Sequence, residues 1–199
     1  MKIFLIMLFI LFGLFVGFQI YTTMATNKAK EQPYEVMRSM KDFEIRFYPS
    51  STMATITSSA KSYKELGNSG FKKLAGYIFG GNQTRQKIAM TSPVHMDIND
   101  SVSTMSFVMP TQFNMENLPQ PNDDSVTLKT TSDEYVAAIK FSGFASDADI
   151  KLNSEKLETA LKAASISYYG NFRYLGYNPP YQLLGRKNEI IVSVNWVAK

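Results

Sequence analysis

Residues 43–81 read FEIRFYPSSTMATITSSAKSYKELGNSGFKKLAGYIFGG, and their pattern predicts two strands followed by a helix. Phe43, Ile45 and Phe47 alternate with Glu44, Arg46 and Tyr48, the period of two that marks a strand with one face towards a core. A second strand is expected at residues 53–59, after the Pro49–Ser50 turn. From residue 63 onward the apolar residues recur at helical spacing, and Gly80-Gly81 ends the helix. We expect this amphipathic helix to cover a sheet.

The order strand, helix, strand, strand occurs twice along the chain. In the first half, residues 88–96 and 104–109 follow the helix as strands, and Pro93 interrupts the first of them. In the second half the expected elements are a strand at 135–141, a helix at 154–164 and strands at 171–177 and 189–196. A loop at 111–125, rich in Pro, Asn and Asp, joins the two halves.

These two βαββ units predict the fold class. Neither unit can bury both faces of its strands alone, so the two units must pack together. We expect an α+β domain in which two pseudo-symmetric βαββ halves form a distorted antiparallel β-barrel with two main helices outside. In the second helix Asn153 or Ser154 is the expected N-cap, because their side chains can accept a hydrogen bond from the first turn.

The N-terminal segment has a different character from the rest of the chain. Residues 3–21 read IFLIMLFILFGLFVGFQIY, in which Gln19 is the one strongly polar side chain. Such a run can cross ~30 Å of hydrocarbon as a helix, and it lacks the polar face that a buried core helix shows. The sequence therefore predicts an N-terminal transmembrane helix.

The predicted organisation has three parts. Residues 1–21 are a hydrophobic membrane anchor or signal segment, residues 22–32 a polar tether, and residues 33–199 the folded domain. We favour an uncleaved anchor, because the apolar run is long for a signal peptide and Met24 interrupts the small residues at the candidate cleavage site 23–25. The domain is expected outside the cytoplasm, and secreted or periplasmic if cleavage occurs.

The charge balance argues against a nucleic-acid partner. The chain has a formal net charge of +4, but Lys2, Lys28 and Lys30 precede the first acidic residue and leave the remainder at +1. A protein that neutralises many phosphates normally carries a larger excess of Lys and Arg. We therefore expect no nucleic-acid partner.

The shortage of catalytic side chains argues against an enzyme. The chain has no cysteine, which excludes disulfides, thiolate metal sites, a cysteine nucleophile and covalent haem attachment. His95 is the single histidine. A Ser-His-Asp arrangement would therefore have to use His95, and a metal site built from several histidines cannot form. No phosphate-binding loop or dinucleotide motif is present.

Large, soft apolar side chains are abundant instead. The chain holds 14 Phe, 11 Tyr and 11 Met, and such side chains adapt to flat or irregular apolar ligands. Any one of them taken singly, such as Met105 or Phe107, is better explained by packing in a core. Their number as a group is what favours a hydrophobic ligand.

Short motifs along the chain resemble one known family. They occur in the order 34–36 (YEV), 44–48 (EIRFY), 77–82 (YIFGGN), 88–94 (IAMTSPV), 107–110 (FVMP), 118–121 (LPQP), 141–143 (FSG), 177–180 (YNPP) and 186–189 (RKNE). This series resembles the SOUL haem-binding family from residue 33 to residue 197. No single motif is specific, but their shared order over the whole domain makes the resemblance strong.

The resemblance implies a fold, a ligand and a site. The family fold is a pseudo-twofold α+β barrel similar to the ligand-sensing domains of multidrug-responsive regulators. The ligand would be haem or a related tetrapyrrole, held without a covalent bond in an apolar cleft beside the first helix, and no metal other than haem iron is expected. The candidate apolar contacts are Leu66, Phe71, Leu74, Ile78 and Met90. Lys64 and Lys72 could pair with a propionate, and His95 is the possible axial ligand.

Two functions of different kinds stay open from the sequence. The first is a tetrapyrrole carrier, buffer or sensor held at a membrane through residues 3–21. The alternative is a binding module for other amphipathic small molecules or for a partner protein. An enzyme that modifies tetrapyrroles is the weakest option, because only the ligand class suggests it.

Overall fold

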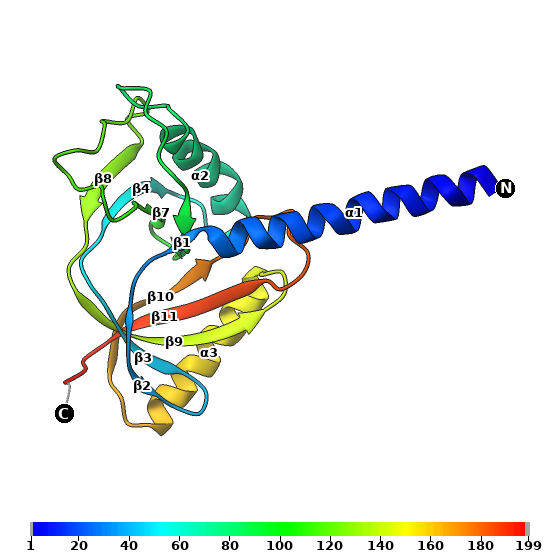
Figure 1. Ribbon diagram of the computed structural model, residues 1–199. Coiled ribbons are helices and arrows are strands. Elements are labelled where there is room, and N and C mark those ends of the chain that lie inside the picture. The colour runs from blue at the N-terminus through cyan, green and yellow to red at the C-terminus, as the bar shows by residue number, and fades with distance from the viewer. Residues whose placement is uncertain (1, 198–199) are drawn as a thin grey trace.

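The strands and helices of the domain follow the apolar periodicity of the sequence (Figure 1). The computed structural model describes residues 2–197. The first half contains β2 (Glu35–Ser39), β3 (Glu44–Tyr48), β4 (Thr52–Ser58), α2 (Tyr63–Ile78), β5 (Thr91–Ser92), β6 (Val94–Asp97) and β7 (Ser103–Val108). The second half contains β8 (Val126–Thr130), β9 (Glu134–Ser142), α3 (Asp147–Ala163), β10 (Tyr168–Gly176) and β11 (Lys187–Val194). Before them come α1 (Lys2–Lys28) and β1 (Lys30–Glu31).

Nine strands form one antiparallel sheet with internal pseudo-symmetry. Their order is β2-β3-β9-β11-β10-β6-β7-β4-β8, so β10 and β6 meet at the centre. The units β4-α2-β6-β7 and β9-α3-β10-β11 lie on the two sides of this centre. In space, β8 joins the first unit, and β2 and β3 join the second; these groups are the first and second halves of the sheet. Within each unit the strands take the same order, which confirms the two βαββ halves expected from the sequence.

The predicted barrel is not closed, so this part of the prediction is wrong. The sheet ends on β2 and β8, which do not pair with each other. The reason lies where the chain crosses between the halves: β3 pairs with β9 in one half, and β4 pairs with β8 in the other. A backbone hydrogen bond of 2.9 Å from Thr131 to Ser51 links the two segments of the chain at this crossing. The sheet therefore folds over at the crossing and leaves two free edges.

Each main helix begins at a serine cap. Ser62 accepts a hydrogen bond from the backbone of Glu65 and starts α2. The first residue of α3 is Asp147, seven residues earlier than expected, because Ser146 and Asp149 form a capping box there. Asn153 and Ser154 are not caps: inside the helix their side chains donate to the carbonyls of Asp149 and Ile150.

One continuous apolar core lies between the sheet and the two helices. Leu66, Leu74 and Ile78 enter it from α2, while Leu157 and Leu161 enter it from α3. A Cβ atom at position 70 would lie 2.6 Å from Cδ1 of Ile56, so glycine lets α2 approach β4 closely without displacing that side chain. A smaller apolar cluster lies on the opposite face of the sheet, in the second half only: Tyr48, Val136, Ala138, Leu175, Tyr177 and Ile191.

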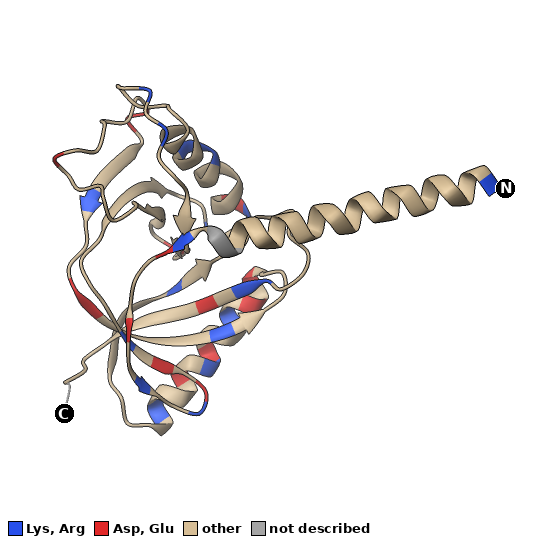
Figure 2. Ribbon diagram, in the orientation of Figure 1, with Lys and Arg blue, Asp and Glu red and all other residues tan. Residues whose placement is uncertain are grey.

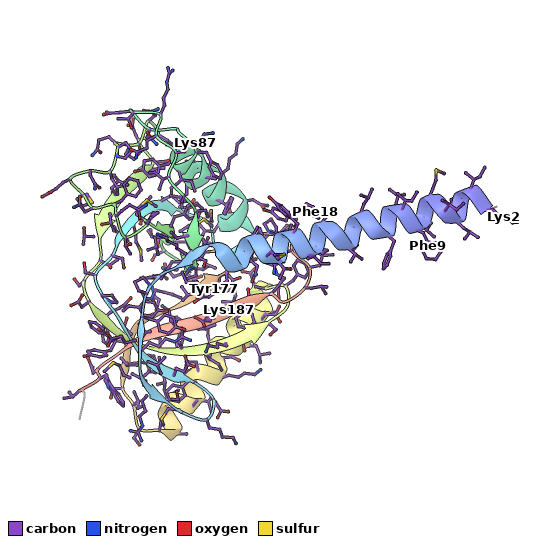
Figure 3. All side chains as sticks on the ribbon, in the orientation of Figure 1. Lys2, Phe9, Phe18, Lys87, Tyr177 and Lys187 are labelled. Atoms are coloured by element: carbon purple, nitrogen blue, oxygen red, sulfur yellow. The ribbon has the colours of Figure 1, made fainter. Side chains whose placement is uncertain are left out.

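The N-terminal helix projects from the domain (Figure 1). Residues 2–26 are long and apolar enough to cross a membrane, and most of their side chains face open space, as Phe9 does in Figure 3. The structure differs from the expected tether at residues 22–32: α1 continues to Lys28, and β1 then pairs in parallel with β5. Thr22 and Gln32 are buried against the domain, so this segment is anchored to it.

Candidate functional site

A hollow in the domain lies where β4 begins and β7 and β8 end. Its volume is about 600 Å³, within the ~300–1,000 Å³ typical of small-molecule sites. We call it the groove. It is lined by residues 30–33, 49–52, 91, 108–111, 113–116 and 130.

Two short segments form the walls of the groove and are held by hydrogen bonds. On one side, the backbone of Gln32 donates to the carbonyl of Ser92 at 2.8 Å, which extends the β1–β5 pairing. On the other side, the loop after Pro110 is ordered by its own side chains. Asn114 Oδ1 accepts hydrogen bonds from the backbone of Glu116 and Asn117. The side chain of Asn117 accepts from the backbone of Asn114 and donates to the carbonyl of Gln112. Hydrogen bonds within the protein therefore hold both walls in place.

The groove has apolar surfaces and a charged rim. Its apolar residues are Pro33, Pro49, Val108, Met109, Pro110, Phe113 and Met115. Met115 is 43% exposed, while Met109 is buried at 4%. Lys30, Glu31 and Glu116 stand at the rim, and Glu31 forms an ion pair with Lys187 at 3.1 Å. An amphipathic molecule would match this division: Lys30 could pair with an acidic group of the ligand, and Glu116 with a basic one.

His95 lies behind the groove and does not line it. Its Nε2 atom lies 2.7 Å from Oε1 of Gln32, and Gln32 in turn donates to Ser51. Burial, assisted by the positive charges of Arg173 and Lys129, lowers the pKa of His95 to about 3. The imidazole is therefore neutral at pH 7 and donates to Gln32.

The apolar contacts expected along the first helix lie mostly in the core. Leu66, Leu74 and Ile78 are at most 1% exposed, so none can touch a ligand in this conformation. Phe71 is 38% exposed and packs edge-on against Phe107 at 5.3 Å between ring centroids. Neither the groove nor the second hollow is lined by a residue of α2.

The remaining predicted site residues do not gather either. Lys64 and Lys72 are exposed on α2. Met90 is half-buried and packs against the main core. The structure therefore does not bring the eight predicted residues into one site, and a ligand role for each of them stays a prediction.

A second hollow lies beside α3. Its volume is about 520 Å³, and its lining includes Asp147, Lys151, Tyr168 and Phe172. Two charged side chains of α3 line it, and three charged residues line the groove, but the groove is larger and has more apolar lining residues. The groove is therefore the better candidate for a flat apolar ligand.

The corresponding face in the second half is filled by a buried ion pair. Arg46 and Glu189 are both 0% exposed and are joined by two hydrogen bonds of 2.8 and 3.0 Å. Burial opposes the charge of Arg46, but the hydrogen bonds and the charge of Glu189 outweigh it and raise the pKa of the guanidinium. Tyr177 donates to Glu189 at 2.7 Å, and the guanidinium stacks 4.2 Å over the ring of Tyr34. No groove residue takes part in this pair.

Comparison with known proteins places the chain in a family. A profile described as SOUL heme-binding protein matches residues 29–193. The chain belongs to the SOUL heme-binding protein family. Heme-binding protein 1 of Xenopus laevis is 28% identical over 156 residues, which cover 74% of this chain and 81% of the relative. Heme-binding protein 2 of Mus musculus is 27% identical over 169 residues, covering 79% and 80%.

Solved structures share the fold of the SOUL domain at very low sequence identity. The C-terminal domain of EcmrR superposes with a TM-score of 0.61 at 7% identity, over 82% of this chain and 99% of that one. A hydrolase from Listeria innocua gives a TM-score of 0.57 at 8% identity, over 79% and 94%. At this level of identity the likeness shows the fold alone.

The groove was not predicted from the sequence, although one signal was present. Phe113 and Met115 are apolar residues in a loop that is otherwise polar, which is unusual unless they cover something. By volume and by lining, the groove fits a tetrapyrrole macrocycle. The single histidine does not fit as an iron ligand, because its Nε2 atom is buried and bonded to Gln32.

Proposed function

We propose that this protein binds haem or a related tetrapyrrole non-covalently in the groove, at a membrane in which α1 anchors it. Its role would be that of a carrier, buffer or sensor, with the domain outside the cytoplasm. The observation that carries the proposal is the groove of about 600 Å³ with apolar surfaces, in a domain whose relatives are named for haem binding.

Apolar contact supplies the main driving force in this proposal. Burial of apolar surface contributes roughly 25 cal/mol per Å², so a few hundred Å² offset most of the cost of association. A bound tetrapyrrole would supply flat apolar ring faces and acidic side groups. Met115, Phe113 and the prolines would contact the ring, and Lys30 would pair with a carboxylate at the rim.

The proposed anchor rests on the exposure of α1. Its side chains from Ile3 to Phe18 are exposed apolar groups, which a water-soluble protein would bury. The 19 residues from Ile3 to Tyr21 span about 28 Å as a helix, close to the ~30 Å of a hydrocarbon core.

Binding rather than catalysis is favoured by the state of the few reactive groups. His95 is buried, neutral and bonded to Gln32, so it is poorly placed to move protons for a bound ligand. Within residues 2–197 no group of three or more His, Asp and Glu side chains is arranged to hold a metal ion. We therefore propose a ligand-binding protein without an enzymatic step.

A titration with haemin tests the proposed function. The purified full-length protein should give a saturable change in the Soret band at one ligand per chain. Protoporphyrin without iron should compete, because the ring makes most of the contacts. If neither haemin nor protoporphyrin gives a saturable signal, the proposal is overturned.

A binding site for other amphipathic molecules is the second candidate. The acidic residues Glu31 and Glu116 at the rim favour it, because they suit a cationic ligand. Thermal unfolding with lipids, steroids and cationic dyes separates the two, since a ligand of the native state raises the midpoint. A shift with tetrapyrroles alone would count against the second candidate.

A further inference from the structure

The loop between β10 and β11 carries an exposed apolar surface beside the base of α1. Residues 177–185 read YNPPYQLLG and contain no charged side chain, as Figure 2 also shows. Tyr181, Leu183 and Leu184 are 56%, 43% and 69% exposed. Phe18 of α1 lies 6.0 Å from Tyr181 between ring centroids. The surface is therefore continuous with the apolar face of the helix.

The buried side chain of Arg186 donates hydrogen bonds to the backbone carbonyls of this loop. Gly185 has a φ of +64°, which turns the chain so that Arg186 lies beneath the loop. The guanidinium donates to the carbonyls of Pro179 and Gln182 at 2.7 Å each, and to that of Asn178 at 3.4 Å. The loop thus turns its carbonyl groups inward and its apolar side chains outward, which is what an apolar environment demands of a polypeptide backbone.

Gln19 fixes the loop to the helix. Its side-chain amide donates to the carbonyl of Tyr181 at 3.2 Å, and its Oε1 accepts from the backbone of Leu183 at 3.0 Å. A further hydrogen bond joins Thr26 to the side chain of Gln182 at 2.7 Å. Three hydrogen bonds therefore join the helix to the loop, and two of them are made by Gln19, the polar residue of the apolar run.

The position of Gln19 along α1 sets the depth of the loop. It lies near the end of the apolar run, where a membrane-spanning helix reaches the interface between hydrocarbon and water. Tyr side chains favour this interface because they combine an apolar ring with a polar tip. We propose that residues 178–185 dock in the interfacial layer of the bilayer that α1 spans, an inference that rests on the proposed membrane anchor. The loop and helix together would hold the domain in one orientation at the membrane surface.

Lipid quenching of single labels tests this docking. The chain has no cysteine, so Leu184→Cys, Leu11→Cys and Val197→Cys each give one labelling site for an environment-sensitive dye in the full-length protein. Each replaced side chain is more than 60% exposed, so none of the three changes disturbs the core. The proteins are reconstituted in phosphatidylcholine vesicles with or without brominated lipid.

Val197 is the matched control, because it is an exposed apolar residue at the end of the chain opposite to α1 (Figure 1). The label at position 184 should be blue-shifted and quenched several-fold more than the label at position 197. Strong quenching at position 11 reports the insertion of α1.

Each other outcome contradicts the docking in a distinguishable way. Quenching at position 11 with none at position 184 overturns the docking and leaves the anchor in place. No quenching at either position overturns both. A label at position 184 that is shielded from water but not quenched by lipid means that a protein surface, such as a second copy of the chain, covers the loop.

Discussion

The two halves of the sheet share a backbone plan but differ in what fills the face away from the helices. In the second half, Arg46 and Glu189 form a fully buried ion pair surrounded by tyrosines, and Lys187 lies over the ring of Tyr177 at 3.8 Å (Figure 3). In the first half, the corresponding face carries neutral groups such as Thr55, Ser106 and His95, with the groove beside them. The two halves therefore share a backbone plan but differ in their side chains. On this face the second half contains a buried ion pair, and the first half contains the groove.

Breaking the buried ion pair should have the largest effect. Glu189→Leu leaves the buried guanidinium of Arg46 with only Glu44, which is 24% exposed, as a carboxylate partner at 2.8 Å. The free energy of unfolding should therefore fall by about 3 kcal/mol. Denaturant unfolding followed by the fluorescence of Trp196, the single tryptophan, measures this loss.

Two matched variants sharpen this result. Arg46→Met combined with Glu189→Leu removes both charges and should be more stable than Glu189→Leu alone. Glu134→Leu breaks the pair with Arg173, which has similar geometry but is about one-quarter exposed, and should cost at most about 1 kcal/mol. Equal losses for Glu189→Leu and Glu134→Leu would contradict the claim that the buried ion pair contributes more to stability than the partly exposed one.

Acidification should destabilise the neutral first half through His95. The pKa of this histidine is about 3 in the folded state, against about 6.5 in an unfolded chain. Between these values the unfolded state binds more protons, so the stability present above pH 6.5 is lost as the pH falls. We expect a loss of about 2 kcal/mol between pH 8 and pH 5.

His95→Gln provides the control for this pH effect, because a glutamine cannot titrate but can still donate to Gln32. Its stability should be nearly constant from pH 8 to pH 5, a range in which most carboxylates stay charged. The same loss in the variant and in the wild type would assign the pH dependence to other groups.

Removal of His95 should affect haemin binding little. His95→Ala is expected to keep the haemin dissociation constant within about tenfold, or ~1.4 kcal/mol, because the side chain lies behind the groove wall. Soret titration together with circular dichroism separates binding from folding. A far larger loss in a protein with unchanged circular dichroism would make His95 an iron ligand.

The smallest effect is expected from charges at the rim of the groove. Lys30→Glu should weaken haemin by about fivefold at most, because exposed ion pairs contribute ~1 kcal/mol or less. An uncharged porphyrin ester should not respond. Lys64→Glu with Lys72→Glu is the control on α2, where both lysines lie outside the groove. A greater loss of haemin affinity in this double variant than in Lys30→Glu would instead support the cleft beside α2 that the sequence predicted.

Most of the fold could be predicted from the sequence because its signals are local. Alternation in β3 and β9 and the helical spacing in α2 come from residues adjacent in the chain. The edge strands β2 and β8 were missed: β2 is exposed throughout and β8 largely so, which leaves little apolar pattern to detect. The open sheet could not be foreseen, since it depends on the crossing at Ser51 and Thr131, 80 residues apart.

The site was harder to predict because its parts come from distant segments. Helical spacing placed Leu66, Leu74 and Ile78 on one face correctly, but it could not show that this face is sealed against the sheet. The groove needs Gln32, Thr91 and Met109 to meet through pairing of β1 with β5, and a two-residue strand has no periodicity to detect. The resemblance to the family indicated the ligand class, but the cleft beside the first helix that it implied is not the groove, which no residue of α2 lines.

The most direct test of the groove as the tetrapyrrole site compares haemin binding by Met115→Glu and Phe79→Glu. Both residues are exposed and apolar, at 43% and 63%, and each change adds one negative charge, but only Met115 lines the groove. A carboxylate placed against an apolar ring loses hydration, so Met115→Glu should weaken haemin by about tenfold or more, while Phe79→Glu should stay within about twofold. The account is contradicted if Phe79→Glu abolishes binding and Met115→Glu leaves it unchanged.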